Sequence, residues 1–281
     1  MERIRRALEQ AEKDRSKLRE SAKAASLPEA PAVNNQTGAH APGRVSEVGF
    51  KGTRVLDLAP DVFEQNRLVA ALPDHKLADI YRMLRTRVLQ SMNSNGWNAL
   101  AVTSPATGAG KTLTSINLAI SLAREIDRTV LLADFDLRCP SIHTYFNYEP
   151  SVGLSDYLFH NAPIEDILFS PSIEKLVVLP GRESIHHSSE ILRSPQMVTL
   201  VEELKSRYTD RLVIFDLPPV LAIDDALAFA PYADAMLMVA ENGATKRDDL
   251  EHSLKLLKNI PMIGTVLNKA ERVNAATYKR K

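Results

Sequence analysis

The most informative segment of this chain is Thr103-Ser-Pro-Ala-Thr-Gly-Ala-Gly-Lys-Thr112. It follows a short apolar run at residues 99–103 and precedes an amphipathic pattern at residues 113–124, which predicts a strand, a glycine-rich turn and a helix. Gly108 and Gly110 lack side chains, so backbone N–H groups can close around a phosphate there. The beginning of the helix adds a dipole that favours an anion. The segment is therefore typical of a phosphate-binding loop.

Two polar residues complete this segment. Lys111 can reach the β- and γ-phosphates of a nucleotide, and Thr112 can offer its hydroxyl to Mg²⁺. The strict pattern has glycine at the place of Pro105, so a glycine-rich turn without a ligand is the alternative. The expected nucleotide contacts are Thr107, Gly108, Ala109, Gly110, Lys111, Thr112 and Leu113.

Carboxylates follow two other predicted strands. One apolar run ends in Asp134-Phe-Asp136, and a period of two residues puts both aspartates on one side of an extended chain. Another apolar run ends in Asp216. Ligands of open parallel sheets lie beyond the carboxyl ends of the strands, so the three aspartates and Thr112 predict a site for Mg²⁺ and a nucleotide. Each aspartate by itself could instead form a turn or cap a helix.

Three motifs carry a family resemblance. TSPATGAGKT, TVLLADFDLRCP and RLVIFDLPP resemble, in this order, the Walker A, Walker A′ and Walker B motifs of bacterial tyrosine kinases (BY-kinases) of the cytoplasmic CpsD/CapB type. The resemblance covers roughly residues 76–269. It implies an α/β fold: a P-loop NTPase of the ParA/MinD-like superclass with a deviant Walker A motif and a mostly parallel sheet covered by helices on both faces. It also implies an autophosphorylating, ATP-dependent protein-tyrosine kinase that regulates exopolysaccharide or capsule polymerisation and export.

The same resemblance assigns roles to the candidate residues. Lys111 would neutralise phosphate charge, and Asp134 would accept the proton of a tyrosine hydroxyl. Mg²⁺ would bind Thr112 and Asp136, with Asp216 acting through water. Asp134 and Asp136 could exchange roles, and the sequence leaves both assignments open.

Two other functions fit parts of the sequence. ParA/MinD-like assembly ATPases carry an additional lysine five residues before the P-loop lysine, where this chain has Ala106. A non-catalytic, ATP-binding scaffold of a polysaccharide export complex is the third hypothesis. Asn268, at the end of the last predicted strand, matches a position that contacts adenine in this superclass, although it could be a turn residue. Arg138 could neutralise phosphate charge or hold a neighbouring subunit.

The predicted helix at residues 75–89 carries a possible assembly motif. Asp79, Arg82 and Arg85 are spaced as neighbours on a helix, and they resemble the E-x-x-R-x-x-R motif that builds a ring of subunits in this family, with aspartate in place of glutamate. Local ion pairing is the alternative. The residues expected to face inward are Leu77, Ile80, Leu84 and Val88.

The rest of the chain alternates between predicted strands and helices, which favours a parallel sheet with both faces covered. The further helices are expected at 155–169, 189–208 and 246–259, and the further strands at 175–180, 235–240 and 262–268. We expect a charged N-terminal helix at 1–24, a mostly flexible linker at 25–75, the P-loop domain at 76–270 and a short basic tail at 271–281. The tail contains one tyrosine, Tyr278, which is the candidate phosphoacceptor.

Composition limits the possible partners and compartments. The chain has 35 basic and 35 acidic residues, so its net charge does not favour nucleic acid. Its single cysteine excludes an intrachain disulfide. Neither a signal peptide nor a transmembrane run is evident, so we expect a cytoplasmic protein, peripheral at the inner membrane through a partner. The resemblance implies that this partner is a membrane activator of the chain-length or co-polymerase type.

Overall fold

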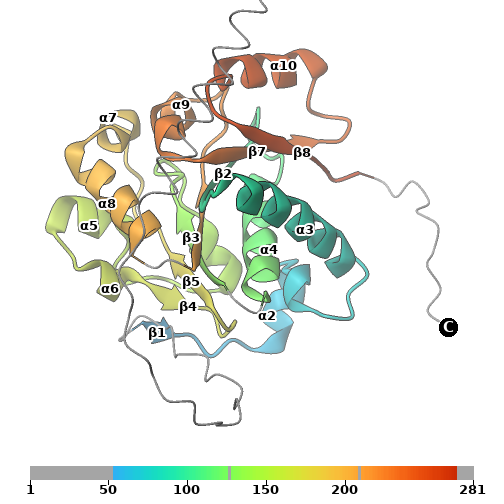
Figure 1. Cartoon of the computed structure of the whole chain (residues 1–281). Coiled ribbons are helices and arrows are strands. Elements are labelled where there is room, and N and C mark those ends of the chain that lie inside the picture. The colour runs from blue at the N-terminus through green and yellow to red at the C-terminus, as the bar shows by residue number, and fades with distance from the viewer. Residues whose placement is uncertain (1–52, 126–127, 208–209, 271–281) are drawn as a thin grey trace, which may run out of the picture. The chain divides into compact units, whose positions relative to one another are not determined.

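The computed structural model describes residues 53–125, 128–207 and 210–270 (Figure 1). The expected N-terminal helix at 1–24, most of the linker and the tail at 271–281 lie outside these residues. In the described part, one sheet has the strand order β1-β4-β5-β3-β6-β2-β7-β8. Its strands are β1 (Arg54–Val55), β2 (Ala99–Thr103), β3 (Thr129–Asp134), β4 (Phe169–Ser170), β5 (Leu176–Leu179), β6 (Arg211–Asp216), β7 (Ala235–Glu241) and β8 (Met262–Asn268).

Helices connect these strands and cover the sheet (Figure 1). The α-helices are α2 (Pro60–Gln65), α3 (Ala78–Asn95), α4 (Lys111–Ala123), α5 (Leu154–His160), α6 (Ile164–Ile167), α7 (Ser188–Leu192), α8 (Pro195–Ser206), α9 (Asp225–Phe229) and α10 (Arg247–Leu256). The described residues also form the short 3₁₀ helices η1 (Val69–Ala71), η2 (Ile142–Phe146) and η3 (Ala230–Tyr232).

The sheet separates two hydrophobic clusters, because alternate residues of a strand point to opposite faces. On β6, Val213 and Phe215 belong to the cluster with α5, α7, α8 and α9, whereas Leu212 and Ile214 belong to the cluster with α3 and α4. Among the described residues, all strand pairings are parallel except that of β4 with β5. The predicted α/β fold, with a mostly parallel sheet covered on both faces, is confirmed.

Two of the predicted helices are interrupted. The helix expected at 155–169 ends at His160, where Asn161 has a φ of 54°, and Pro163 follows before α6. The helix expected at 189–208 is divided into α7 and α8, because Pro195 cannot continue α7 and begins α8. The Ser194 hydroxyl accepts a hydrogen bond from the Met197 amide at 3.2 Å and caps the new helix.

The buried face of α3 differs from the predicted one. Val88 is buried and Leu84 partly buried, as expected, but Leu77 and Ile80 are 38% and 53% exposed. Met92, in the last turn, is buried instead. Since α3 packs at the margin of the fold, only a narrow stripe of it touches α4 and η1, and the apolar residues outside this stripe face solvent.

The domain begins earlier than residue 76. Residues 54–71 form β1, α2 and η1, and Leu68 at the start of η1 is fully buried. The Asn117 side chain of α4 accepts a hydrogen bond from the Ala70 amide at 2.9 Å and donates one to the Arg67 carbonyl. This part of the expected linker is therefore packed against α4. No helix of the described residues combines the length and apolarity needed to cross a membrane.

Candidate nucleotide-binding site

The glycine-rich loop joins the carboxyl end of β2 to α4. Gly108 and Gly110 have φ values of 80° and 86°, in the left-handed region that favours glycine. A Cβ at Gly110 would also collide with the side-chain amide of Asn268. That amide donates a hydrogen bond to the Ala109 carbonyl at 2.9 Å, so the end of β8 lies directly against the loop. The backbone geometry that the glycines were expected to provide is present.

Lys111, the first residue of α4, lies among the acidic residues of the other two motifs. Its Nζ is 2.8 Å from Asp136 Oδ2 and 3.4 Å from Asp216 Oδ2. It is also 3.1 Å from the Thr112 hydroxyl. Burial alone would lower the pKa of Lys111, but the carboxylates of Asp216 and Asp136 outweigh burial and raise it. The lysine is therefore charged, and it holds two strand ends together.

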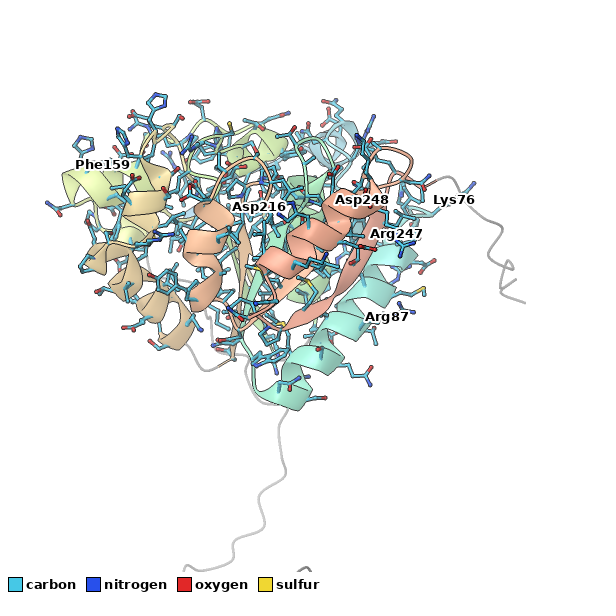
Figure 2. The ribbon with its side chains drawn as sticks, turned by 90° about the horizontal axis from the view of Figure 1, so that it is seen from above. Lys76, Arg87, Phe159, Asp216, Arg247 and Asp248 are labelled. Atoms are coloured by element: carbon cyan, nitrogen blue, oxygen red, sulfur yellow. The ribbon has the colours of Figure 1, made fainter. Side chains whose placement is uncertain are left out.

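Asp216 is fully buried at the end of β6, among the central strands and away from Arg87 on α3 (Figure 2). The Thr112 hydroxyl donates a hydrogen bond to its Oδ2 at 2.6 Å, and the Ser115 hydroxyl donates one to its Oδ1 at 2.9 Å. Burial raises the pKa of Asp216, against the influence of Lys111 and these two hydroxyls. Sequence reasoning missed Ser115, although a serine one turn after Lys111 on a buried helix was a usable signal.

Asp134, the last residue of β3, has a different environment. Its Oδ2 accepts hydrogen bonds from the amides of Ser141 and Ile142 at 2.8 and 2.9 Å. Its Oδ1 is buried and has no hydrogen-bond partner among the described residues. Burial and the nearby Asp216 raise the pKa of Asp134 to about 7. A carboxyl group that titrates near neutral pH suits general base catalysis.

Asp136 lies beyond the end of β3, in a tight loop. One of its carboxylate oxygens accepts a hydrogen bond from the Cys139 amide at 3.2 Å, and the other contacts Lys111. The two aspartates of this motif thus differ: Asp134 accepts hydrogen bonds from two backbone amides, whereas Asp136 accepts one from a backbone amide and pairs with the P-loop lysine. Tyr145 of η2, which the sequence did not single out, is close enough that burial and Asp216 raise its pKa.

The residues at this site fit a magnesium nucleotide. Asp136, Asp216 and the Thr112 hydroxyl are hard oxygen donors, which Mg²⁺ prefers. Within the part of the chain that the structure describes, Asp134 also has a buried oxygen that makes no hydrogen bond. Among the described residues, no group of three or more acidic, histidine or cysteine side chains could hold a metal ion by itself.

The expected assembly residues lie elsewhere, on α3. Arg82 forms an exposed ion pair with Asp79. Arg85 is used within its own chain: its Nε lies 2.9 Å from Glu125, and its Nη1 donates a hydrogen bond to the Ser121 carbonyl at 3.1 Å. Asp79 and Arg82 are therefore accessible to a partner, whereas Arg85 caps the end of α4.

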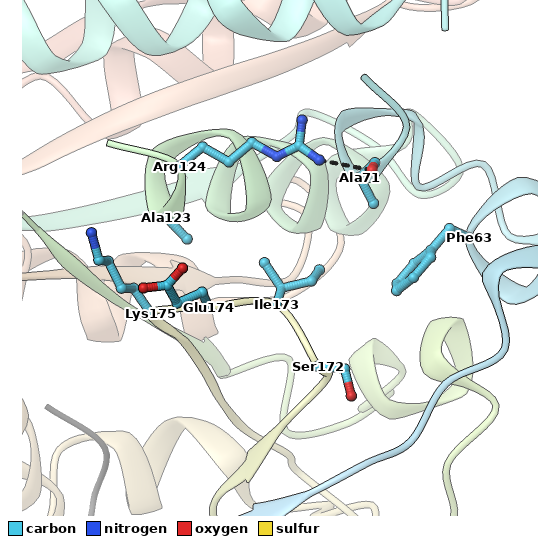
Figure 3. A pocket seen from close by; sticks show the side chains of 8 residues that line it. All are labelled: Phe63, Ala71, Ala123, Arg124, Ser172, Ile173, Glu174 and Lys175. Carbon is cyan, nitrogen blue, oxygen red and sulfur yellow. Dashed lines mark hydrogen bonds between the residues drawn. The ribbon is translucent and has the colours of Figure 1, made fainter. Parts of the chain in front are cut away.

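A separate pocket lies near the opposite end of α4 from Lys111 (Figure 3). It has a volume of about 410 Å³ and includes Phe63, Arg124 and Lys175. Arg124 donates a hydrogen bond across it to the Ala71 carbonyl at 2.7 Å. Since a helix rises 1.5 Å per residue, this pocket is about 20 Å along α4 from the glycine-rich loop. It is not part of the nucleotide site.

Comparisons with known proteins show the family of this chain. The family described as the CobQ/CobB/MinD/ParA nucleotide binding domain matches residues 100–280. The putative tyrosine-protein kinase EpsB of Ralstonia nicotianae is 32% identical over 206 residues, which are 73% of this chain and 27% of EpsB. The tyrosine-protein kinase YwqD of Bacillus subtilis is 30% identical over 207 residues, which are 73% of this chain and 86% of YwqD.

A solved structure of a tyrosine kinase is also similar to this chain. The kinase domain of the Escherichia coli tyrosine kinase ETK superposes with a TM-score of 0.68 at 26% identity, covering 79% of this chain and 91% of that domain. The fold and the site thus define a P-loop nucleotide-binding protein of the CobQ/CobB/MinD/ParA class. Within that class, the chain belongs to the bacterial tyrosine kinase family, as its three motifs predicted. It spans about a quarter of the length of EpsB.

Proposed function

We propose that this protein is an ATP-dependent protein-tyrosine kinase that phosphorylates itself and regulates the polymerisation or export of an exopolysaccharide or capsule. One observation carries the proposal most directly: Lys111 lies between Asp136 and Asp216, at 2.8 and 3.4 Å, beside the Thr112 hydroxyl. This supports a site in which Lys111, at the beginning of α4, binds phosphate close to two candidate metal ligands and a hydroxyl.

The proposed roles follow from these contacts. The loop amides of residues 107–113 and Lys111 bind the phosphates of ATP. Thr112 and Asp136 hold Mg²⁺, which when bound neutralises phosphate charge, and Asp216 acts through water. Asn268 uses its amide nitrogen on the Ala109 carbonyl, and this leaves its side-chain oxygen for the adenine edge.

Asp134 is the proposed general base toward a tyrosine hydroxyl. Two backbone amides fix one of its oxygens, and the other has no hydrogen-bond partner among the described residues, so that oxygen is available to a proton. A pKa raised to about 7 gives the ionised form a useful population near neutral pH and a matched driving force for proton transfer. Asp136, by contrast, is engaged by Lys111, which favours the metal role for it.

The acceptor and the partners complete the proposal. Tyr278 is the candidate phosphoacceptor of the tail. Asp79 and Arg82, exposed on α3, are the candidate contacts of a homo-oligomeric ring, with Arg85 acting indirectly through the end of α4.

The activator is a membrane protein of the co-polymerase type, and the kinase is cytoplasmic and reaches the membrane through it. No nucleic acid takes part.

Mass spectrometry after incubation with ATP and Mg²⁺, with and without the membrane partner, tests this function. Phosphotyrosine in the wild-type chain and its absence in Lys111→Met is the expected result. ATP turnover with every tyrosine unmodified would favour a ParA/MinD-like assembly ATPase instead. Binding of ATP without turnover or modification would leave a non-catalytic scaffold.

A further inference from the structure

The pocket at the far end of α4 from Lys111 has a mixed lining, and we call it the α4-end pocket. Its volume of about 410 Å³ is within the range of small-molecule sites. Phe63 and Ile173 give it apolar walls, and both side chains point into it (Figure 3). Its charged lining residues are Arg124, Lys175 and Glu174. Two cations against one carboxylate favour an anionic ligand over a cationic one.

Arg124 contributes a positive charge that no carboxylate of the described residues neutralises. It is the residue that follows α4, and its Nη2 donates a hydrogen bond to the Ala71 carbonyl at 2.7 Å. In the part of the chain that the structure describes, Arg124 takes part in no ion pair. Partial burial lowers the pKa of Arg124, and the charges of Arg82 and Arg85 lower it further. An anion bound to Arg124 would offset this repulsion between cations.

The wall opposite Arg124 has a strained backbone that is tied down at both ends. Ser172 and Lys175 have φ values of 56° and 64°, in the left-handed region that residues other than glycine rarely adopt. The Ser172 hydroxyl donates a hydrogen bond to the Leu56 carbonyl, and the Lys175 ammonium donates one to the Glu125 carbonyl at 3.3 Å. Strained backbone of this kind is concentrated at ligand-binding sites. The pocket is therefore formed before any ligand binds.

We propose that the α4-end pocket binds a small organic anion, whose carboxylate or phosphate group pairs with Arg124 and whose apolar part packs on Phe63 and Ile173. A guanidinium presents a planar set of N–H donors that suits either anionic group. The site is distinct from the nucleotide site, because Lys111 begins α4 and Arg124 follows its end. The proposal goes beyond the kinase function and does not depend on it.

The alternative is that Arg124 and Lys175 only stabilise the end of α4. Cations near the last carbonyls of a helix are favourable without any ligand. In that case, replacing Arg124 would lower the stability of the fold, and the pocket would bind no anion. Measurements of binding and of stability on the same variants therefore separate the two roles.

The test titrates two probes, benzoate and phenyl phosphate, into the full chain and measures their affinity by ligand-observed NMR. Each titration is made with and without MgADP. We expect binding that MgADP does not displace, and the probe that binds more tightly shows whether the anionic group is a carboxylate or a phosphate. Arg124→Gln should weaken that binding about tenfold or more, because hydrogen bonds to charged groups contribute strongly to affinity.

The matched control is Arg87→Gln, on α3. Arg87 is exposed and lies outside the lining of the pocket, so the variant loses the same charge elsewhere on the surface (Figure 2). It should bind the probes as the wild type does. Phe63→Leu should weaken binding as well, since the phenyl ring of each probe loses an aromatic partner. Thermal melting checks that each variant is folded, and Arg124→Lys, which loses the planar donors, replaces Arg124→Gln if that variant does not fold.

Four outcomes would overturn the proposal. These are no binding of either probe at millimolar concentrations, unchanged binding in the folded Arg124 variant, an equal loss in Arg87→Gln, and displacement of the probes by MgADP. Displacement by MgADP would place the probes at the glycine-rich loop. No binding together with a lower melting temperature in Arg124→Gln would leave Arg124 as a stabiliser of the end of α4 alone.

Discussion

The Nζ of Lys111 and Oδ2 of Asp136 lie 2.8 Å apart, so the P-loop lysine is paired with a carboxylate that a metal would need. Without nucleotide, this pair neutralises charge inside the site. In the proposed complex with a nucleotide, the lysine would bind the phosphates, and Asp136 would be left to bind Mg²⁺. The charge of Lys111 would thus pair with Asp136 in one state and with the phosphates in the other. Replacing Lys111 and replacing Asp136 should therefore have different effects on nucleotide binding.

Replacing the lysine should remove most of the affinity for phosphates. In Lys111→Met, we expect ADP binding without Mg²⁺ to weaken about 10- to 100-fold, because hydrogen bonds to charged groups contribute about 1.5–3 kcal/mol. Titration calorimetry measures this loss, and Lys258→Met, at an exposed lysine, is the control. Intact affinity in Lys111→Met would contradict the phosphate-binding assignment.

Replacing the aspartate should affect the metal instead. In Asp136→Asn, we expect ADP to bind without Mg²⁺ at least as tightly as in the wild type, since Lys111 is released from its ion pair. The additional affinity that Mg²⁺ provides should be lost. Competition with a fluorescent ADP analogue over a range of Mg²⁺ concentrations measures both effects. An unchanged dependence on Mg²⁺ would exclude Asp136 as a ligand.

The two glycines of the loop should differ in sensitivity. Gly108→Ala places a Cβ in open space and costs about 1–2 kcal/mol for a left-handed residue. Gly110→Ala adds a collision with the Asn268 amide, so it should destabilise the fold further and displace Asn268 from the loop. Urea denaturation of both variants, with ADP binding as a second measurement, tests this order. Equal stability losses would argue against the close approach of β8.

The two arginines of α3 should separate stability from assembly. Arg85→Ala removes contacts with Glu125 and the Ser121 carbonyl, so we expect a loss of about 1–3 kcal/mol in the free energy of unfolding. Arg82→Ala removes only an exposed pair with Asp79 and should cost less than about 1 kcal/mol. If α3 forms a ring contact, Arg82→Ala should nevertheless reduce the sedimentation coefficient. An unchanged sedimentation coefficient in Arg82→Ala would show that Arg82 makes no ring contact and that α3 only packs within its own chain.

Asp156 should make stability depend on pH. Its carboxylate accepts hydrogen bonds from the Gly153 amide and from Arg182, both at 2.8 Å. Burial would raise the pKa of Asp156, but these two partners outweigh it and lower the pKa. A lowered pKa in the folded state means that the stabilisation is present above the unfolded pKa of about 4 and is lost as the pH falls through the folded value.

Asp156→Asn is the variant that tests this dependence. We expect it to be about 1–3 kcal/mol less stable than the wild type at pH 7. The difference should shrink as the pH falls below about 4. Urea denaturation at several pH values gives the comparison. A difference that does not change with pH would show that the loss comes from packing and not from the charge.

Much of the site was predictable because its signals are local. The spacing of Gly108, Gly110 and Lys111 requires only one turn and one helix, and the aspartates follow apolar runs that read as strands. The order of these strands in the sheet then brings the motifs together. Asn268 lies at the end of the last strand, as predicted. Its hydrogen bond to the Ala109 carbonyl could not be predicted from the sequence.

The remaining features depend on packing between distant segments. Ile80 has the spacing of a core residue, but it is exposed because α3 lies at the margin of the fold. Arg85 fits an assembly motif, but its guanidinium contacts Glu125 and a carbonyl near the end of α4 in the same chain. Asp225 reads as an ordinary helix-starting aspartate, but it is fully buried where α7 packs against α9. No pattern within one segment contains this information.

The contact between Asn268 and the Ala109 carbonyl also fixes a point of attachment. The candidate acceptor Tyr278 follows Asn268 by ten peptide units, which span at most about 36 Å when fully extended. The segment that carries Tyr278 therefore starts from the end of β8, beside the phosphate-binding loop. Tyr278 can therefore lie no farther than this distance from the end of β8. Any other active site that phosphorylates Tyr278 must come within the same distance of β8.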